Sequence, residues 1–251
     1  MFSLEGKTVL ITGASSGLGQ HFASLLSDAG GRVILGARRV DKLQHIVEQI
    51  KTQGREAFAL EIDVTNQQSI TKCFDAIEQI APIDILVNNA GVSVTKALLD
   101  QTEEDFDLVM NTNLKGAWLV ATEAARRMRD AKRPGSIINI ASILGERVAG
   151  GVAPYAISKA GVIQATKVMA LELAKHHIRV NALLPGYIVT DLNRDFLLSE
   201  KGDKLKARIP SRRFGQLDDL NGPLLLLASP AGMAMSGSCI AVDSGHLVNT
   251  L

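Results

Sequence analysis

The chain has 251 residues, and 46% of them are hydrophobic, which is enough for a substantial folded core. Its formal net charge is +1 and charges of both signs are mixed along the chain, so electrostatics give no case for a nucleic-acid partner or an anionic membrane surface. The apolar run at 224–228 is too short to cross a bilayer, and the segment 1–7 reaches a charged turn too early for a signal peptide. We therefore expect a cytoplasmic protein.

Near the start of the chain, an apolar strand at 9–11 runs into a glycine-rich turn and then into an amphipathic helix at 20–29. Glycines at these positions allow a tight turn and keep side chains away from a phosphate, while the N–H groups and dipole of the helix face the anion. We expect a dinucleotide to bind through the residues of this turn, which are Gly13, Ser15, Ser16, Gly17, Leu18 and Gly19. The alternative is a glycine-rich turn without a ligand, because the spacing meets the general dinucleotide fingerprint only approximately.

Strands and helices alternate along the rest of the chain. Strands are predicted at 32–36, 57–62, 83–87, 136–141, 178–184 and 238–242. Helices are predicted at 43–50 with Asp41 as the cap, and at 70–80, 103–129 and 154–175. Repeated β-α-β units predict an α/β fold, a doubly wound (Rossmann) parallel seven-stranded sheet with helices on both faces. No linker divides the chain, so we expect a single domain over 1–251.

The segment 187–215 breaks this alternation because it is long and has weak periodicity. We expect it to form a mobile lid that closes over cofactor and substrate and selects an uncharged, largely apolar carbonyl compound. Its apolar residues are Ile188, Leu192, Phe196, Leu197 and Leu198, whereas its charged residues from Lys201 to Arg208 are expected to face solvent. The alternative is an ordinary helix packed permanently on the core or at a subunit contact.

Small, polar and charged residues follow the predicted strand ends, where ligands bind in an open parallel sheet. Ser142 ends the fifth strand, and Tyr155 and Lys159 lie four residues apart on one face of the next helix. A nearby cation is expected to lower the pKa of a phenol from about 10. In carbonyl reduction Tyr155 would donate a proton to the substrate oxygen, Ser142 would hydrogen-bond that oxygen, and Lys159 would tune Tyr155. Each residue alone has an ordinary structural alternative.

The residues after the second strand predict the type of dinucleotide. An acidic residue there would accept the ribose hydroxyls of NAD, but Ala37, Arg38 and Arg39 occupy the position. Arginine pairs with phosphate through several charge-assisted hydrogen bonds. We therefore expect NADP(H), with Arg38 as the main contact to the additional phosphate and with Arg39 and Ser15 as helpers; the alternative is that both arginines are solvated loop charges.

Together these motifs resemble a classical short-chain dehydrogenase/reductase. The resemblance rests on Thr12-Gly-x3-Gly-x-Gly19, Asn88-Asn-Ala-Gly91, Asn113, Ser142, Tyr155-x3-Lys159 and Pro185-Gly186, which stand in the family's order over nearly the whole chain. It implies that the carbonyl of Asn113 holds a water connected to Lys159, as a fourth member of the catalytic set. It also implies a homotetramer built on the helices at 103–129 and 154–175.

The resemblance further assigns contacts to the cofactor. Lys159 would contact the nicotinamide ribose, beside Tyr155. The other implied cofactor-binding residues are Asp63 and Val64 at the adenine, Asn89, Ala90 and Gly91, Pro185 and Gly186, and Ile188 and Thr190 at the carboxamide. The histidines lack metal-ligand spacing, so no metal is expected.

These observations predict an NADP(H)-dependent oxidoreductase that acts on a small ketone or secondary alcohol. Alternatives within the same class are a 3-oxoacyl thioester reductase and a sugar or polyol dehydrogenase. A nucleotide-binding regulator without catalysis is the alternative from another class, because a fold does not determine a function. The loops at 93–98, 143–152 and 187–215 would shape the substrate pocket.

Overall fold

The computed structural model describes residues 2–190 and 193–248. Within these ranges, seven parallel strands form one sheet in the order β3-β2-β1-β4-β5-β6-β7. The strands are β1 (Thr8–Thr12), β2 (Arg32–Ala37), β3 (Ala57–Glu61), β4 (Ile85–Asn88), β5 (Gly135–Ile140), β6 (Ile178–Pro185) and β7 (Cys239–Val242). The predicted fold class, a doubly wound parallel sheet, is confirmed.

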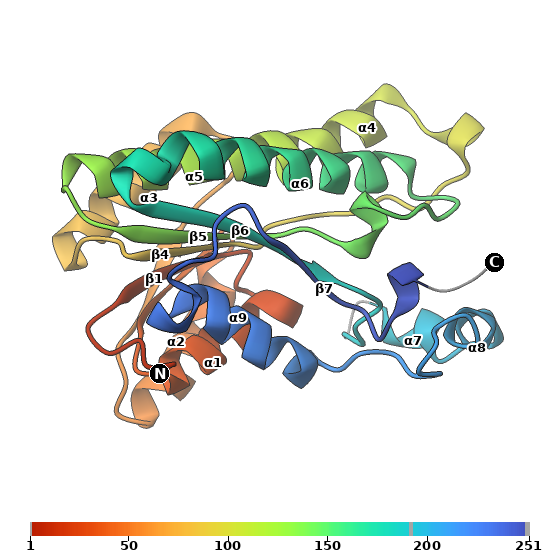
Figure 1. Ribbon diagram of the computed structural model, residues 1–251, viewed down its shortest axis with the longest axis horizontal. Helices are drawn as coiled ribbons and strands as arrows, with labels where there is room; N and C mark the ends of the chain where they lie inside the picture. Colours follow the sequence, from red (N-terminus) through yellow and green to blue (C-terminus); the bar gives the residue numbers. More distant parts are fainter. Residues whose placement is uncertain (1, 191–192, 249–251) are drawn as a thin grey trace.

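Helices cover both faces of this sheet (Figure 1). They are α1 (Gly17–Asp28), α2 (Val40–Thr52), α3 (Gln67–Ile80), α4 (Glu103–Met110), α5 (Ala117–Asp130), α6 (Ala153–Leu173), α7 (Arg194–Leu197), α8 (Glu200–Lys206) and α9 (Asn221–Ala228). One face packs against α1, α2 and α9, and the other against α3, α5 and α6. Successive side chains of β1 point to opposite faces of the sheet: Ile11 packs on the side of α1, α2 and α9, and Leu10 packs on the side of α3, α5 and α6.

The strand order changes direction between β1 and β4. The chain proceeds from β1 to β2 and β3 on one side, and then crosses to β4 and continues to β7 on the other. This change of direction leaves a crevice beyond the carboxyl ends of the strands, where ligands bind in this class of fold.

Three local predictions need correction. Asp41 does not cap α2: the capping residue is Arg39, and Asp41 lies in the first turn, where its charge complements the helix dipole. The helix predicted at 103–129 is α4 and α5 joined by a π-helical turn, Asn111–Gly116. Helix α9 was not predicted, because its sequence NGPLLLLA has no alternation of apolar and polar faces.

Candidate active site

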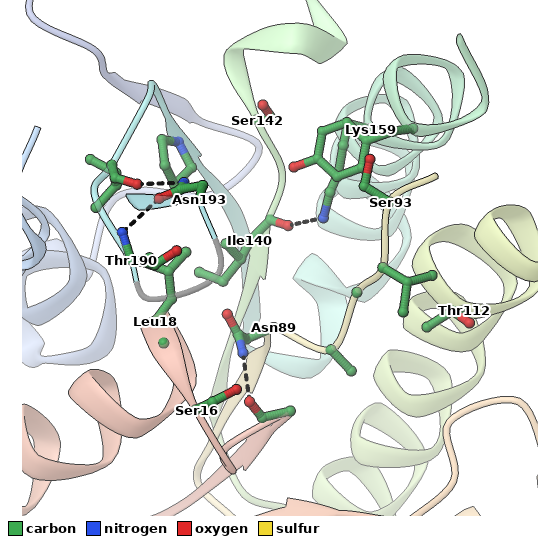
Figure 2. A pocket seen from close by; sticks show the side chains of 18 of the residues that line it. Ser16, Leu18, Asn89, Ser93, Thr112, Ile140, Ser142, Lys159, Thr190 and Asn193 are labelled. Carbon is green, nitrogen blue, oxygen red and sulfur yellow. Dashed lines mark hydrogen bonds between the residues drawn. The ribbon is translucent and has the colours of Figure 1, made fainter. Parts of the chain in front are cut away.

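A cavity of about 800 Å³ lies beyond the carboxyl ends of the strands. The residues predicted to form the site line it, except Gly19 and Asn113, which are buried. The predicted residues in its wall are Gly13, Ser15, Ser16, Gly17, Leu18, Arg38, Arg39, Asp63, Val64, Asn89, Ala90, Gly91, Ser142, Tyr155, Lys159, Pro185, Gly186, Ile188 and Thr190. Figure 2 shows Ser16 and Asn89 toward one end of this cavity and Ser142 and Lys159 toward the other.

The glycine-rich turn after β1 has the conformation expected from sequence. Gly13 and Gly17 have positive φ values of 66° and 55°, which favour glycine. A Cβ atom on Gly13 would lie 2.9 Å from Cα of Ala90, and a Cβ atom on Gly19 would overlap the carbonyl of Gly13. Helix α1 begins at Gly17, so its first N–H groups lack partners within the helix. They lie where the turn borders the cavity and are available to an anion there.

The loop after β4 is held against this turn by a residue whose role sequence reasoning missed. The hydroxyl of Thr12 accepts hydrogen bonds from the backbone N–H groups of Asn89 and Ala90, both at 3.0 Å. The amide of Asn89 in turn donates to the carbonyl of Thr12 at 2.9 Å. A threonine at the last position of a strand before a glycine turn was the available signal, since its hydroxyl is placed to meet the neighbouring strand end.

Asn113 lies in the π-helical turn between α4 and α5 and is 1% exposed. Its side chain accepts a hydrogen bond from N–H of Val92 and donates one to the carbonyl of Val92, both at 2.8 Å, and it also donates to the hydroxyl of Ser158. A Cβ atom on Gly91 would lie 3.3 Å from Oδ1 of Asn113 and 3.7 Å from Nζ of Lys159. The side chain of Asn113 therefore positions the loop that borders Lys159.

Ser142, Tyr155 and Lys159 come together at the end of β5 and the start of α6. The hydroxyl of Ser142 is near enough to Tyr155 to influence the pKa of its phenol, and Ser142 Oγ accepts a hydrogen bond from N–H of Leu144 at 3.1 Å. Lys159 Nζ donates to the carbonyl of Ile140 at 2.8 Å, a bond visible in Figure 2, and lies 5.5 Å from the centroid of the Tyr155 ring. A phenol, a hydroxyl and an ammonium thus share one wall of the cavity.

The pKa values of this group are set by burial. Burial lowers the pKa of Lys159 from 10.5 to about 8. Burial also raises the pKa of Tyr155, the hydroxyl of Ser142 lowers it, and the neighbouring Tyr187 raises it when ionised, with a net increase. The net lowering of the Tyr155 pKa that the sequence predicted is therefore wrong for this structure, because loss of solvation outweighs the favourable contacts.

The corner of the cavity after β2 and β3 is polar and charged. Arg38 and Arg39 are exposed and line the cavity together with Asp63. Burial opposes ionisation of Asp63, but hydrogen bonds from Thr65 and the charge of Arg38 give it a net lowered pKa. Asp63 is therefore a carboxylate at neutral pH, beside two arginines that are open to an anionic ligand.

The segment 187–215 contains two short helices, α7 and α8. Ile188 and Leu197 are 5% and 0% exposed and belong to buried clusters, whereas Phe196 and Leu198 are 50% and 69% exposed. Leu192 lies outside the described residues. Asn193 joins the start of the segment, since it accepts from N–H of Thr190 at 2.8 Å and donates to the carbonyl of Ile188 at 2.9 Å (Figure 2). Two members of the expected apolar lid surface, Ile188 and Leu197, are therefore buried in this structure.

The loops expected to shape the substrate pocket do converge on the cavity. Residues in its wall come from the segment after β4 (Ser93, Thr95), the segment after β5 (Ile143, Leu144, Val152) and the segment after β6 (Tyr187, Asn193, Phe196, Leu197).

Among residues 2–190 and 193–248, no helix is both long and apolar enough to traverse a bilayer. In the same described ranges, no cluster of three or more His, Cys, Asp or Glu side chains is arranged to hold a metal ion.

Comparison with known proteins identifies the family. The model of a family described as enoyl-(acyl carrier protein) reductase matches residues 13–246, which is most of the chain. The chain belongs to the short-chain dehydrogenase/reductase family. The glycine turn and the group of Ser142, Tyr155 and Lys159 both lie within the matched range.

Individual members of this short-chain dehydrogenase/reductase family match the chain over nearly its whole length. It is 40% identical to 2-dehydro-3-deoxy-D-gluconate 5-dehydrogenase of Escherichia coli K12, covering 98% of this chain and 97% of that protein. It is 36% identical to 3-oxoacyl-(acyl-carrier-protein) reductase of Staphylococcus aureus Mu50, covering 95% and 97%. The structure of a gluconate 5-dehydrogenase from Burkholderia cenocepacia J2315, in complex with NADP and tartrate, superposes with a TM-score of 0.95 at 34% identity, covering 99% and 98%.

The burial of Lys159 predicts how the stability of this short-chain dehydrogenase/reductase depends on pH. The pKa of Lys159 is about 8 in the folded chain and 10.5 ordinarily. Below pH 8 the buried charge destabilises the folded state, and this destabilisation is lost as the pH rises toward 10.5, because the folded chain releases the proton first. The difference in unfolding free energy between Lys159→Met and the wild type should shift by about 2 kcal/mol in favour of the wild type from about pH 6.5 to 9.5. Urea titrations at both pH values measure it, and a difference that does not vary with pH would contradict the assignment.

Proposed function

We propose that this chain is an NADP(H)-dependent oxidoreductase that interconverts a ketone and a secondary alcohol. The observation that carries the proposal is that Ser142, Tyr155 and Lys159 share one cavity with the glycine turn. The named relatives support the same reaction class, since they include dehydrogenases of hydroxy acids and a reductase of an oxo group.

The residues around the cavity fit an NADP(H) molecule. Gly13 and Gly19 leave no room for side chains against the neighbouring backbone, so the turn stays tight at the start of α1, where a pyrophosphate is expected, and Arg38 and Arg39 lie beyond β2, where the 2′-phosphate of this cofactor is expected. The Burkholderia cenocepacia relative with NADP supports this choice. We propose that Ser15, Ser16, Leu18, Asp63, Val64 and the residues 89–91, 185–186, 188 and 190 complete the contacts.

When bound, the nicotinamide supplies or accepts the hydride. In the reducing direction Tyr155 Oη donates a proton to the carbonyl oxygen, and Ser142 Oγ hydrogen-bonds the same oxygen as negative charge develops there. Lys159, with its ammonium beside the ring of Tyr155, stabilises the phenolate that remains after proton transfer. In the oxidising direction Tyr155 removes the hydroxyl proton. Asn113 acts through its hold on the loop at Val92 and, in our proposal, through a water at its carbonyl.

The direct test is loss of NADPH absorbance with a panel of ketones that includes simple ketones, oxo acids and 3-oxoacyl thioesters. We expect turnover with at least one class and a higher efficiency with NADPH than with NADH. Binding of NADPH without turnover across the panel would instead favour a nucleotide-binding regulator.

We also propose a homotetramer and a cytoplasmic location. The support for assembly is a set of exposed apolar side chains on α4, α5 and α6, namely Phe106, Leu108, Trp118, Val168 and Leu171. Exposed apolar side chains gathered on neighbouring helices are typical of subunit contacts. Sedimentation equilibrium should give the mass of four chains, and a monomer would contradict the proposal.

The segment 187–215 remains our proposed lid. Its support is that Thr190, Asn193 and Phe196 line the cavity, and that part of the segment packs in a small cluster of its own built on Leu197, Ile209 and Phe214. Hydrogen exchange in this segment should slow when NADP(H) and product are added, because closure protects its amides. Exchange that stays unchanged would favour a permanently packed segment.

A further inference from the structure

Helix α6 carries two buried hydroxyl groups that are bonded in the same way, and one of them lies in the turn with Tyr155 and Lys159. The helix belongs to the layer that also holds α4 and α5, and the π-helical turn between those helices packs against it (Figure 1). Ser158 and Thr166 are both 0% exposed. Each accepts a hydrogen bond from a buried asparagine outside the helix and donates one to a carbonyl of the preceding turn of α6. The two hydroxyls therefore tie α6 to other elements at two points along its length.

The bridge at Ser158 runs from the loop after β4 to the backbone of Tyr155. Oδ1 of Asn113 accepts from N–H of Val92, which fixes the orientation of the amide. Nδ2 of Asn113 then donates to the carbonyl of Val92 at 2.8 Å and to Oγ of Ser158 at 3.1 Å, so both of its hydrogens are used. Oγ of Ser158 donates in turn to the carbonyl of Tyr155 at 2.7 Å. Consecutive hydrogen bonds thus join the loop to the peptide group of Tyr155.

The first turn of α6 is not fixed by a helix cap. The helix begins at Ala153, and the residue before it is Val152, whose side chain has no acceptor for the first N–H groups. On one side this part of α6 meets the turn after β5, since a Cβ atom on Gly145 would lie 2.8 Å from the carbonyl carbon of Lys159. The tie to the loop after β4 runs through Ser158. The position of the turn that carries Tyr155 and Lys159 therefore depends on this hydroxyl.

The loop at the other end of the bridge borders the part of the cavity where the cofactor is expected. Residues 89–91 line the cavity, and the hydroxyl of Thr12 holds the start of the loop. Hydride and proton transfer need the nicotinamide and the phenol in fixed relative positions, and a displacement of about 1 Å can lower a rate by about 100-fold. A bridge from the cofactor loop to the turn of Tyr155 controls that relative position.

The bridge at Thr166 has the same chemistry in a different place. Nδ2 of Asn139 donates to Oγ1 of Thr166 at 2.9 Å, and Thr166 donates to the carbonyl of Val162 at 2.8 Å. This bridge starts inside β5 and meets α6 about two turns beyond Lys159, or about 10 Å along the helix axis. It packs the helix on the sheet, whereas the bridge at Ser158 connects the two parts of the cavity wall that must act together.

We infer that Ser158 is a positioning residue that fixes the turn of Tyr155 and Lys159 against the loop after β4. This inference rests on the proposed function, in which Tyr155 exchanges a proton with the substrate. The hydroxyl of Ser158 is fully buried and engaged in both of its bonds, so it acts through Tyr155 and not on the substrate itself. Its loss should affect the rate more than cofactor affinity, because Thr12 and Asn113 still hold the cofactor loop.

The kinetic test compares Ser158→Ala with Thr166→Val, which removes an equally buried hydroxyl from the same helix. NADPH oxidation is followed with cyclohexanone, 4-oxopentanoate and acetoacetyl coenzyme A, and stability is measured by urea unfolding. Both variants leave a buried asparagine donor unpaired, so both should be less stable than the wild type. Ser158→Ala should lower kcat by about 10- to 100-fold and change the KM for NADPH by less than about twofold, whereas Thr166→Val should keep kcat within about twofold of the wild type.

Two further variants at the same position keep the test decisive. Ser158→Thr should recover most of the rate, because a threonine hydroxyl in a helix can donate to the carbonyl three or four residues earlier. Ser158→Cys fills the space of serine but is a weak donor and acceptor, so it should lower kcat in the same way and replaces Ser158→Ala if that variant does not fold. An unchanged kcat in both Ser158→Ala and Ser158→Cys overturns the inference. So does an equal loss of kcat in Thr166→Val, which would mean that only helix packing matters, or a loss confined to the KM for NADPH.

Hydrogen exchange decides the inference if the wild type turns over no compound, in which case the proposed function fails. In Ser158→Ala the amides of residues 156–162 should exchange faster than in the wild type, and those of 166–173 should stay unchanged. Thr166→Val should show the reverse pattern. Unchanged exchange at 156–162 in Ser158→Ala, or equally faster exchange along the whole helix, would refute the role of Ser158.

Discussion

Replacing Tyr155 with phenylalanine should lower kcat by about 100- to 10,000-fold, the range that general acid–base catalysis contributes. Affinity for NADPH should stay nearly unchanged, because the ring still packs in the cavity wall and only the hydroxyl is removed. Turnover would be followed by NADPH absorbance and affinity by quenching of protein fluorescence.

Lys159→Ala is the matched comparison for this variant. Removal of the ammonium should weaken both the rate and cofactor binding, since we propose that Lys159 serves both the phenol and the nicotinamide ribose. It also leaves the carbonyl of Ile140 without its donor. Thermal melts of both variants check that they fold. Substantial activity of Tyr155→Phe would mean that a different group is the acid.

The double substitution Ala37→Asp with Arg38→Leu should shift the cofactor preference toward NADH, by about 100-fold or more in the ratio of efficiencies. Arg38 is exposed at the cavity wall, so its removal eliminates the main proposed partner of the 2′-phosphate without disturbing the core. An aspartate after β2 would accept the ribose hydroxyls of NADH and repel the phosphate of NADPH. Efficiencies with both cofactors are measured for the wild type and the variant.

Lys42→Leu is the control for loss of positive charge near this corner. Lys42 is exposed on α2 and does not line the cavity, so the preference should remain that of the wild type. A wild type that clearly prefers NADH would contradict the assignment of Arg38, and an equal shift in the Lys42 variant would assign the preference to general electrostatics.

Much of the cofactor half of the molecule could be predicted because its signals are local. The positive φ angles of Gly13 and Gly17 follow from a tight strand-to-helix turn, which few other residues allow. The expected strand ends placed Arg38 and Asn89 at one edge of the sheet, since carboxyl ends of parallel strands meet there. Helix α9 was not predicted, because Leu224 and Leu227 lie in a run that is apolar on every side and its sequence shows no helical periodicity.

The sequence by itself determined the β-α-β order, the glycine turn and the four-residue spacing of Tyr155 and Lys159, because each depends on residues close together in the chain. Only the tertiary structure decided the direction of the Tyr155 pKa shift, since desolvation depends on every segment packed around the phenol. It also decided that Arg147 bonds the carbonyl of His246, 99 residues away. Contacts of this kind arise from the order of β5, β6 and β7 in the sheet, and no local pattern encodes which loops will meet.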